Sequence, residues 1–261
     1  MDASSSATKM FSALQSQQSL RSQIATTLLS GGLALYQDGK YSQAIAAFKQ
    51  ASAYVPENVD AYNYAAKAYL KQGKTKEAID SYKLSVSIDR SQSGIWVELG
   101  NVYYSEKRYS EAENAFKTAA RYDPTDTLAP YTLGQLYLQT ERYSEAENQF
   151  KKVIKMTPRD GNVYYALGAA YNKMGRHDEA VTQLEKAVSL KKDFALARFE
   201  LGTAYLGLDD RDKAEEQLEI LKDLDTSLSA ELESDLSSPK ISMFMASKST
   251  FSPTLGAGTP L

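Results

Sequence analysis

The chain has 261 residues, no cysteine and one histidine, and its 30 Lys and Arg nearly balance its 33 Asp and Glu, giving a net charge of −3. This balance disfavours a nucleic-acid binder, which needs a clustered positive surface. The lack of cysteine excludes thiol nucleophiles and disulfides, and a single histidine excludes a multi-histidine metal site. No apolar run is long enough to span a membrane. The first residues also lack the pattern of a signal peptide, so we expect a cytoplasmic protein.

The segment from residue 1 to residue 24 is rich in Ser, Gln, Ala and Leu. Met10 and Leu14 are four residues apart, so we expect a flexible start followed by a marginal amphipathic helix that caps the open end of the fold. An interfacial membrane anchor is the alternative. We disfavour it because only Lys9 and Arg21 supply positive charge.

From residue 25 onward, one pattern of apolar residues recurs every 34 residues. Its clearest copy predicts two amphipathic helices with one apolar face each: Trp96, Leu99, Gly100 and Tyr103 on the first, then Ala112, Phe116 and Ala119 on the second. The glycine slot recurs as Gly32, Ala66, Gly134, Gly168 and Gly202. Six such units occupy residues 25–228, and a period of this length is typical of a solenoid.

The first unit differs from the others because it carries two adjacent glycines, Gly31 and Gly32. Two glycines within a helix cost roughly 1 kcal/mol each relative to alanine. We interpret them as the mark of a loose terminal repeat. The alternative is a close approach of the preceding cap helix to a bare backbone.

The turn between the two helices of a unit carries a glycine in three units, at Gly39, Gly73 and Gly175, which suits a positive φ. Lys107, Glu141 and Asp209 stand there in the other units. Two residues later, the slot that holds Tyr41, Tyr109 and Tyr143 holds His177 in the fifth unit. We therefore expect His177 to pack between helices rather than to carry proton chemistry.

After the sixth unit, Leu228, Leu232 and Leu236 continue at helical spacing, so we expect a short capping helix that ends before Pro239. The rest of the 229–261 segment is a low-complexity tail. Its apolar stretch from Lys240 to Phe251 could occupy a groove of the same or a second molecule, which would permit self-association.

The Leu-Gly, Tyr, Ala, Phe and Pro positions of Leu99, Gly100, Tyr103, Ala112, Phe116 and Pro124 resemble the tetratricopeptide repeat. The resemblance covers about four fifths of the chain. It implies an all-α fold, a right-handed superhelical solenoid of helix-turn-helix repeats, with the N- and C-terminal capping helices added here. It also implies that the first helix of each repeat, helix A, lines a concave groove that holds a peptide or a partner segment.

In that family, helix A residues one, five and eight places after the position of Trp96 point into the groove. The corresponding residues here are Asn63, Lys67, Val97, Asn101, Tyr104, Tyr131, Gln135, Tyr165, Asn172 and Phe199. Side-chain amides can bind the backbone of an extended peptide, and the aromatic stripe offers apolar surface. The alternative is that these tyrosines belong to the core. The subtype that clamps acidic chaperone C-termini is not matched, since Glu98 would repel a carboxylate.

No set of nucleophile, base and orienting group is present, and no glycine-rich phosphate loop. We therefore expect a non-catalytic protein-interaction scaffold with a protein or peptide partner and without cofactor, metal or nucleic acid. Two alternatives remain. The chain could be the superhelical arm of a larger enzyme, such as a glycosyltransferase-linked protein, or a self-assembling structural scaffold.

Overall fold

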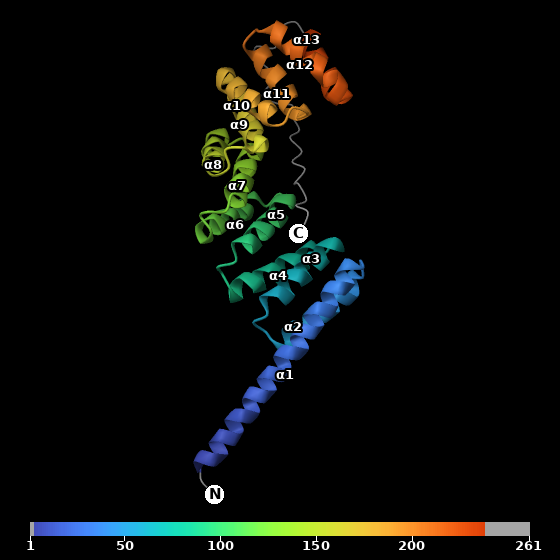
Figure 1. Cartoon of the computed structure of the whole chain (residues 1–261), viewed down its shortest axis with the longest axis vertical. Coiled ribbons are helices and arrows are strands. Elements are labelled where there is room, and N and C mark those ends of the chain that lie inside the picture. The colour runs from blue at the N-terminus through green and yellow to red at the C-terminus, as the bar shows by residue number, and fades with distance from the viewer. Residues whose placement is uncertain (1–2, 238–261) are drawn as a thin grey trace. The chain divides into compact units, whose positions relative to one another are not determined.

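The computed structural model describes residues 3–237, and the side chains from residue 9 onward. The described residues form helices and no strand (Figure 1). In chain order the helices are α1 Ala3–Gln37, α2 Tyr41–Tyr54, α3 Val59–Lys71, α4 Thr75–Ile88, α5 Ser93–Ser105, α6 Tyr109–Tyr122, α7 Leu128–Gln139, α8 Tyr143–Met156, α9 Gly161–Lys173, α10 His177–Leu190, α11 Ala195–Gly207, α12 Arg211–Leu224 and α13 Thr226–Ser237.

The helices pack as consecutive pairs, α1 with α2 through α11 with α12, so the all-α repeat fold predicted from the period is confirmed. Helix A is the odd-numbered member of each pair and helix B the even-numbered one. The chain divides into two compact units, Met1–Asp123 and Pro124–Leu261. In the second unit, α9 contacts both α7 and α11, so successive A helices lie beside one another there. The regular 34-residue period did not predict this division into two units. The period describes how helices pack within a repeat, and it does not say which repeats pack together as one unit.

In four of the six pairs, a large side chain of helix B rests against the bare backbone of a glycine in helix A. Ala66 takes this slot in the pair of α3 and α4, and Gly202 of α11 meets a side chain of α13. A Cβ atom added to Gly32 would lie 2.5 Å from the ring of Phe48, closer than two carbon atoms can approach. The other glycines of the slot meet side chains at 2.5–2.6 Å: Gly100 meets Phe116, Gly134 meets Phe150, Gly168 meets Leu184 and Gly202 meets Leu232. The glycine is therefore required by close helix contact rather than by turn geometry.

The two adjacent glycines of α1 give a matched test of this contact. Gly32→Ala should lower the free energy of unfolding by about 1–3 kcal/mol, because the new methyl group overlaps Phe48. Gly31→Ala should raise it by roughly 0.5–1 kcal/mol, because no described atom lies within 4 Å and alanine favours the helix. Urea unfolding followed by circular dichroism measures both changes. Equal effects of the two substitutions would contradict the packing described.

The six turns within the pairs share one backbone conformation. Each has a residue with positive φ: Gly39 at 75°, Gly73 at 71°, Lys107 at 59°, Glu141 at 59°, Gly175 at 71° and Asp209 at 63°. The next N–H group closes the turn by donating to a carbonyl of helix A, as Arg108 does to Tyr103 at 2.8 Å. The prediction of a positive φ from the three glycines is confirmed, and the same conformation extends to three residues with side chains.

Non-glycine residues at positive φ should be points of local strain. We expect Lys107→Gly and Glu141→Gly each to raise the free energy of unfolding by about 1 kcal/mol, since the left-handed conformation costs other residues roughly that amount. Gly73→Ala should lower the free energy of unfolding, because it places a side chain at a positive φ. Thermal unfolding of the three variants measures the effect. A loss of stability in Lys107→Gly would show that its side chain contributes more than its backbone costs.

The N-terminal helix differs from the prediction. α1 runs from Ala3 to Gln37 without a break, so the expected cap ending near residue 24 is wrong (Figure 1). Met10, Phe11, Leu14 and Leu20 are 56–69% exposed and cover no described residue. No proline interrupts the segment, and the Thr26 hydroxyl bonds back to the carbonyl of Ser22 at 2.9 Å instead of capping a new helix. The segment therefore continues helix A of the first repeat.

At the other end, α13 packs against α11 and α12 and buries Leu232 and Leu236, as predicted for the C-terminal cap. It begins at Thr226, three residues before the expected boundary. Leu232 of α13 also packs against Gly202, whereas the other four glycines of the slot meet a side chain of their own helix B. The predicted tail segment from Lys240 to Phe251 lies outside the described residues.

Candidate functional site

The predicted groove residues of the first unit lie on α3 and α5 and differ in exposure. Val97 is 1% exposed, so it belongs to the core and its assignment to a binding surface is wrong. Asn63 is buried, and its amide donates to Gln92 Oε1 at 3.1 Å. Lys67 is half-buried and forms an ion pair with Glu98 at 3.3 Å.

The side chains of Asn101 and Tyr104 on α5 remain partly exposed to solvent. Both are half-buried, and the Tyr104 ring packs edge-on against Tyr109 with 5.8 Å between ring centroids. Burial raises the pKa of the Tyr104 phenol, and the nearby Tyr109 adds to the effect. The phenol is therefore neutral at physiological pH and can both donate and accept a hydrogen bond.

In the second unit, the predicted aromatic stripe lies mostly within the core. Tyr165 is 8% exposed and Phe199 9%, and the Tyr165 ring lies 5.0 Å from that of Phe194. Tyr131 is half-buried, and desolvation raises its pKa while a hydrogen bond with Gln135 acts in the opposite direction. Only Tyr131 keeps a substantial exposed part, so the expected continuous aromatic surface is reduced to one ring.

Polar residues of the A helices bond to the next helix A or to the residue just before it, which sequence reasoning missed. The partners of Asn63, Lys67 and Asn172 are Gln92, Glu98 and Glu200 respectively. Glu98 and Glu200 occupy the same slot of the repeat, three periods apart, so their shared position was the available signal. These pairs use polar groups that were predicted to bind a partner, although Asn63 Oδ1 is buried without a hydrogen-bond partner.

The pair of Asn172 and Glu200 brings a buried carboxylate into these contacts. Asn172 Nδ2 donates to the Glu200 carbonyl at 2.9 Å and to its carboxylate at 2.8 Å, and Glu200 is 8% exposed. Burial raises the pKa of the Glu200 carboxyl, and Glu231 of α13 raises it further. Asn172 and Lys173 of α9 act to lower it. An ionised carboxylate here is therefore unfavourable for the folded chain.

The raised pKa of Glu200 predicts a pH dependence of stability. The folded chain holds the proton more tightly than the unfolded chain, so stability should fall as pH rises from the unfolded pKa to the folded pKa. Glu200→Gln keeps the hydrogen-bonding shape, so it should raise stability at neutral pH and remove this slope. Unfolding measured between about pH 4 and pH 7 tests the effect, with the exposed Glu215→Gln as control. Destabilisation by Glu200→Gln at every pH would contradict this account.

His177 packs between repeats. A Cβ atom on Gly207 of α11 would lie 2.6 Å from the imidazole, so the ring rests on the glycine backbone. Its Nδ1 lies 3.4 Å from Asn172 Oδ1, and burial lowers its pKa. Among residues 3–237, no group of three or more His, Asp or Glu is placed to hold a metal ion. Within the same range, none of the helices is sufficiently long and apolar to cross a membrane.

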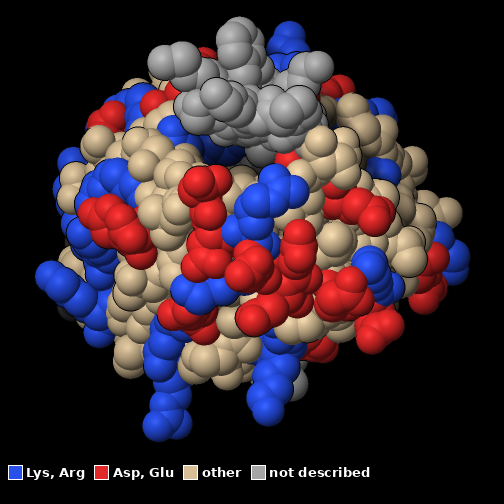
Figure 2. Space-filling model, turned by 90° about the horizontal axis from the view of Figure 1, so that it is seen from above, with Lys and Arg blue, Asp and Glu red and all other residues tan. Residues whose placement is uncertain are grey.

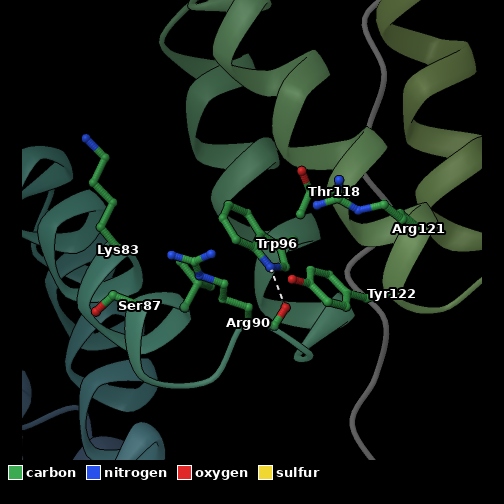
Figure 3. A pocket seen from close by; sticks show the side chains of 8 residues that line it. Lys83, Ser87, Arg90, Trp96, Thr118, Arg121 and Tyr122 are labelled. Carbon is green, nitrogen blue, oxygen red and sulfur yellow. Dashed lines mark hydrogen bonds between the residues drawn. The ribbon is translucent and has the colours of Figure 1, made fainter.

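A second surface feature lies on the first unit, away from the predicted groove residues. It is a hollow of about 310 Å³ lined by Lys83, Val86, Ser87, Arg90, Trp96, Thr118, Arg121 and Tyr122. The Trp96 indole N–H donates to the Arg90 carbonyl at 2.9 Å, which fixes the ring in the hollow (Figure 3). The sequence assigned Trp96 to internal packing only, so this hollow was missed.

Helix pairs with a 34-residue period, glycine contacts and identical turns define the chain as a tetratricopeptide repeat protein. The family model described as the cilia and flagella-associated protein 70 C-terminal domain matches residues 2–234. The chain therefore belongs to this family.

Solved structures agree in fold. The Pseudomonas aeruginosa pilF structure is 20% identical, covers 82% of this chain and 99% of its own, and gives a TM-score of 0.67. YrrB, described as a TPR protein with an unusual peptide-binding site, is 23% identical over 72% of this chain and 97% of its own, with a TM-score of 0.62. A MamA structure is 26% identical, covers 65% of this chain and 95% of its own, and gives a TM-score of 0.57. None of the proteins with curated descriptions matches the chain.

Proposed function

We propose that the chain is a non-catalytic interaction scaffold that binds a segment of a partner protein on the exposed face of α3 and α5, two A helices of its first unit. The observation that carries this proposal is the set of polar and aromatic side chains that stay half-exposed on these two helices: Lys67, Asn101 and Tyr104. The fold likeness to YrrB, whose description names a peptide-binding site, supports the proposal.

The chemistry of these side chains suits an extended peptide. The Asn101 amide can donate to one backbone group and accept from another, so it recognises a peptide without regard to its sequence. Tyr104 adds an apolar ring with a polar tip. The ion pair of Lys67 with Glu98 at 3.3 Å links α3 to α5 on this face. The proposal involves no catalysis, since these side chains do not form a set of nucleophile, base and orienting group.

The test is partner retention by a variant of the exposed face. The matched family takes its name from a protein associated with cilia and flagella, so a lysate of ciliated cells is the first source of partners. The intact chain should retain a defined set of proteins. The variant Asn101→Ala with Tyr104→Ala should bind them about tenfold or more weakly, since truncating one side chain at a binding hot spot costs about 2 kcal/mol.

A matched control changes one residue of each type on B helices of the same unit: Tyr54→Ala on α2 and Asn114→Ala on α6, both of which are exposed. It should retain the partners. Circular dichroism must show that both variants keep their helices. Retention by the A-helix variant together with loss by the B-helix variant would place the binding surface on the opposite face and overturn the proposal.

A further inference from the structure

The hollow around Trp96 concentrates positive charge on a chain whose net charge is −3. Lys83 of α4, Arg90 of the connection after α4 and Arg121 of α6 come from three separate elements and reach the same hollow. Among the described residues, no acidic side chain lines it. The charge of Lys83 helps to lower the pKa of the nearby Glu111 carboxylate. Glu111 is already paired with Arg108 at 2.6 Å. The three cations therefore face the hollow without an acidic residue between them.

Two aromatic side chains line the same hollow. Figure 3 shows Trp96 at its centre, with Arg90 on one side of the indole and Tyr122 on the other. The guanidinium of Arg121 lies 5.4 Å from the centroid of the Tyr122 ring. A half-buried indole beside three exposed cations offers apolar contact and charge pairing within a volume of about 310 Å³. That volume suits two or three side chains of a peptide rather than a folded domain.

We infer that this hollow is a second binding site, which takes an acidic peptide segment of a protein partner, with carboxylates paired to Lys83, Arg90 and Arg121 and an apolar side chain on Trp96. Arginine suits this role because its planar guanidinium pairs with carboxylates through two parallel hydrogen bonds. The site uses different residues from the A-helix face proposed above. Its failure would therefore leave the proposed function untouched.

Among the described residues, α12 and α13 carry many acidic side chains that could compete for the hollow. Residues 211–237, which contain these two helices, include nine acidic and three basic residues. Asp and Glu side chains gather near the centre of the face shown in Figure 2. These carboxylates lie on packed helices, whereas the hollow is small and suits an extended segment. A second copy of the chain is therefore the alternative that the test must separate.

Trp96 is the only tryptophan of the chain, so its fluorescence reports directly on the hollow. The probe is a synthetic peptide of about ten residues that alternates Glu and Asp around one Leu. We expect a saturable change in Trp96 emission that weakens as salt is added, because exposed charge pairs are screened. The triple variant Lys83→Gln, Arg90→Gln and Arg121→Gln should weaken binding of this peptide by about tenfold or more.

The matched control removes three exposed cations of the second unit, Lys152→Gln, Lys155→Gln and Arg159→Gln, and should bind the peptide as the unchanged chain does. A peptide with Gln and Asn in place of Glu and Asp should not change the emission. Four results would overturn the proposal: equal binding of the amide peptide, equal weakening by the control variant, saturation by inorganic phosphate alone, or emission that depends on protein concentration without peptide. The last would indicate a second copy as the occupant.

Discussion

The structure depends on the contact between a bare glycine backbone in helix A and a large side chain from the neighbouring helix. Phe48, Phe116, Phe150 and Leu184 are at most 1% exposed and fill the space that a Cβ atom would need. This contact sets how closely the helices approach, and the shared positive-φ turn sets the direction in which helix B returns. The turn recurs in all six pairs, and the glycine contact with helix B recurs in four of them, so these pairs share one geometry. Stability is local to neighbouring pairs.

Close packing leaves little of helix A for binding, and this determines where function can reside. Val97, Tyr165 and Phe199 contribute to the core, while Asn172 and Lys67 pair with acidic residues of the next repeat. Asn101 and Tyr104 stay half-exposed on α5 of the first unit and form a small polar face there. The hollow around Trp96 is different in character, since it combines exposed cations with aromatic rings. The two surfaces therefore suit different chemistry, a peptide backbone in one case and carboxylates in the other.

The sequence predicted the fold well because glycine, alanine and aromatic positions recur in phase, and the turn glycines predicted a conformation that Lys107 and Glu141 also adopt. The prediction of a separate N-terminal capping helix was wrong, because composition could not distinguish such a helix from a longer α1. The prediction of the site failed for another reason. A family register assigns directions to side chains, but exposure depends on neighbours, and the register could not show that Glu200 lies against Asn172 or that Arg90 and Arg121 meet around Trp96.

Hydrogen exchange of Gly134→Ala measured along the whole chain tests the central claim most directly. The added methyl group would lie 2.6 Å from the Phe150 ring, so α7 and α8 should lose protection. Helices α1 to α4 should keep theirs, since each repeat contacts only its neighbours. Unchanged protection throughout would show that the glycine contact does not set the packing. A uniform loss across all helices would show that the repeats do not behave as locally coupled pairs.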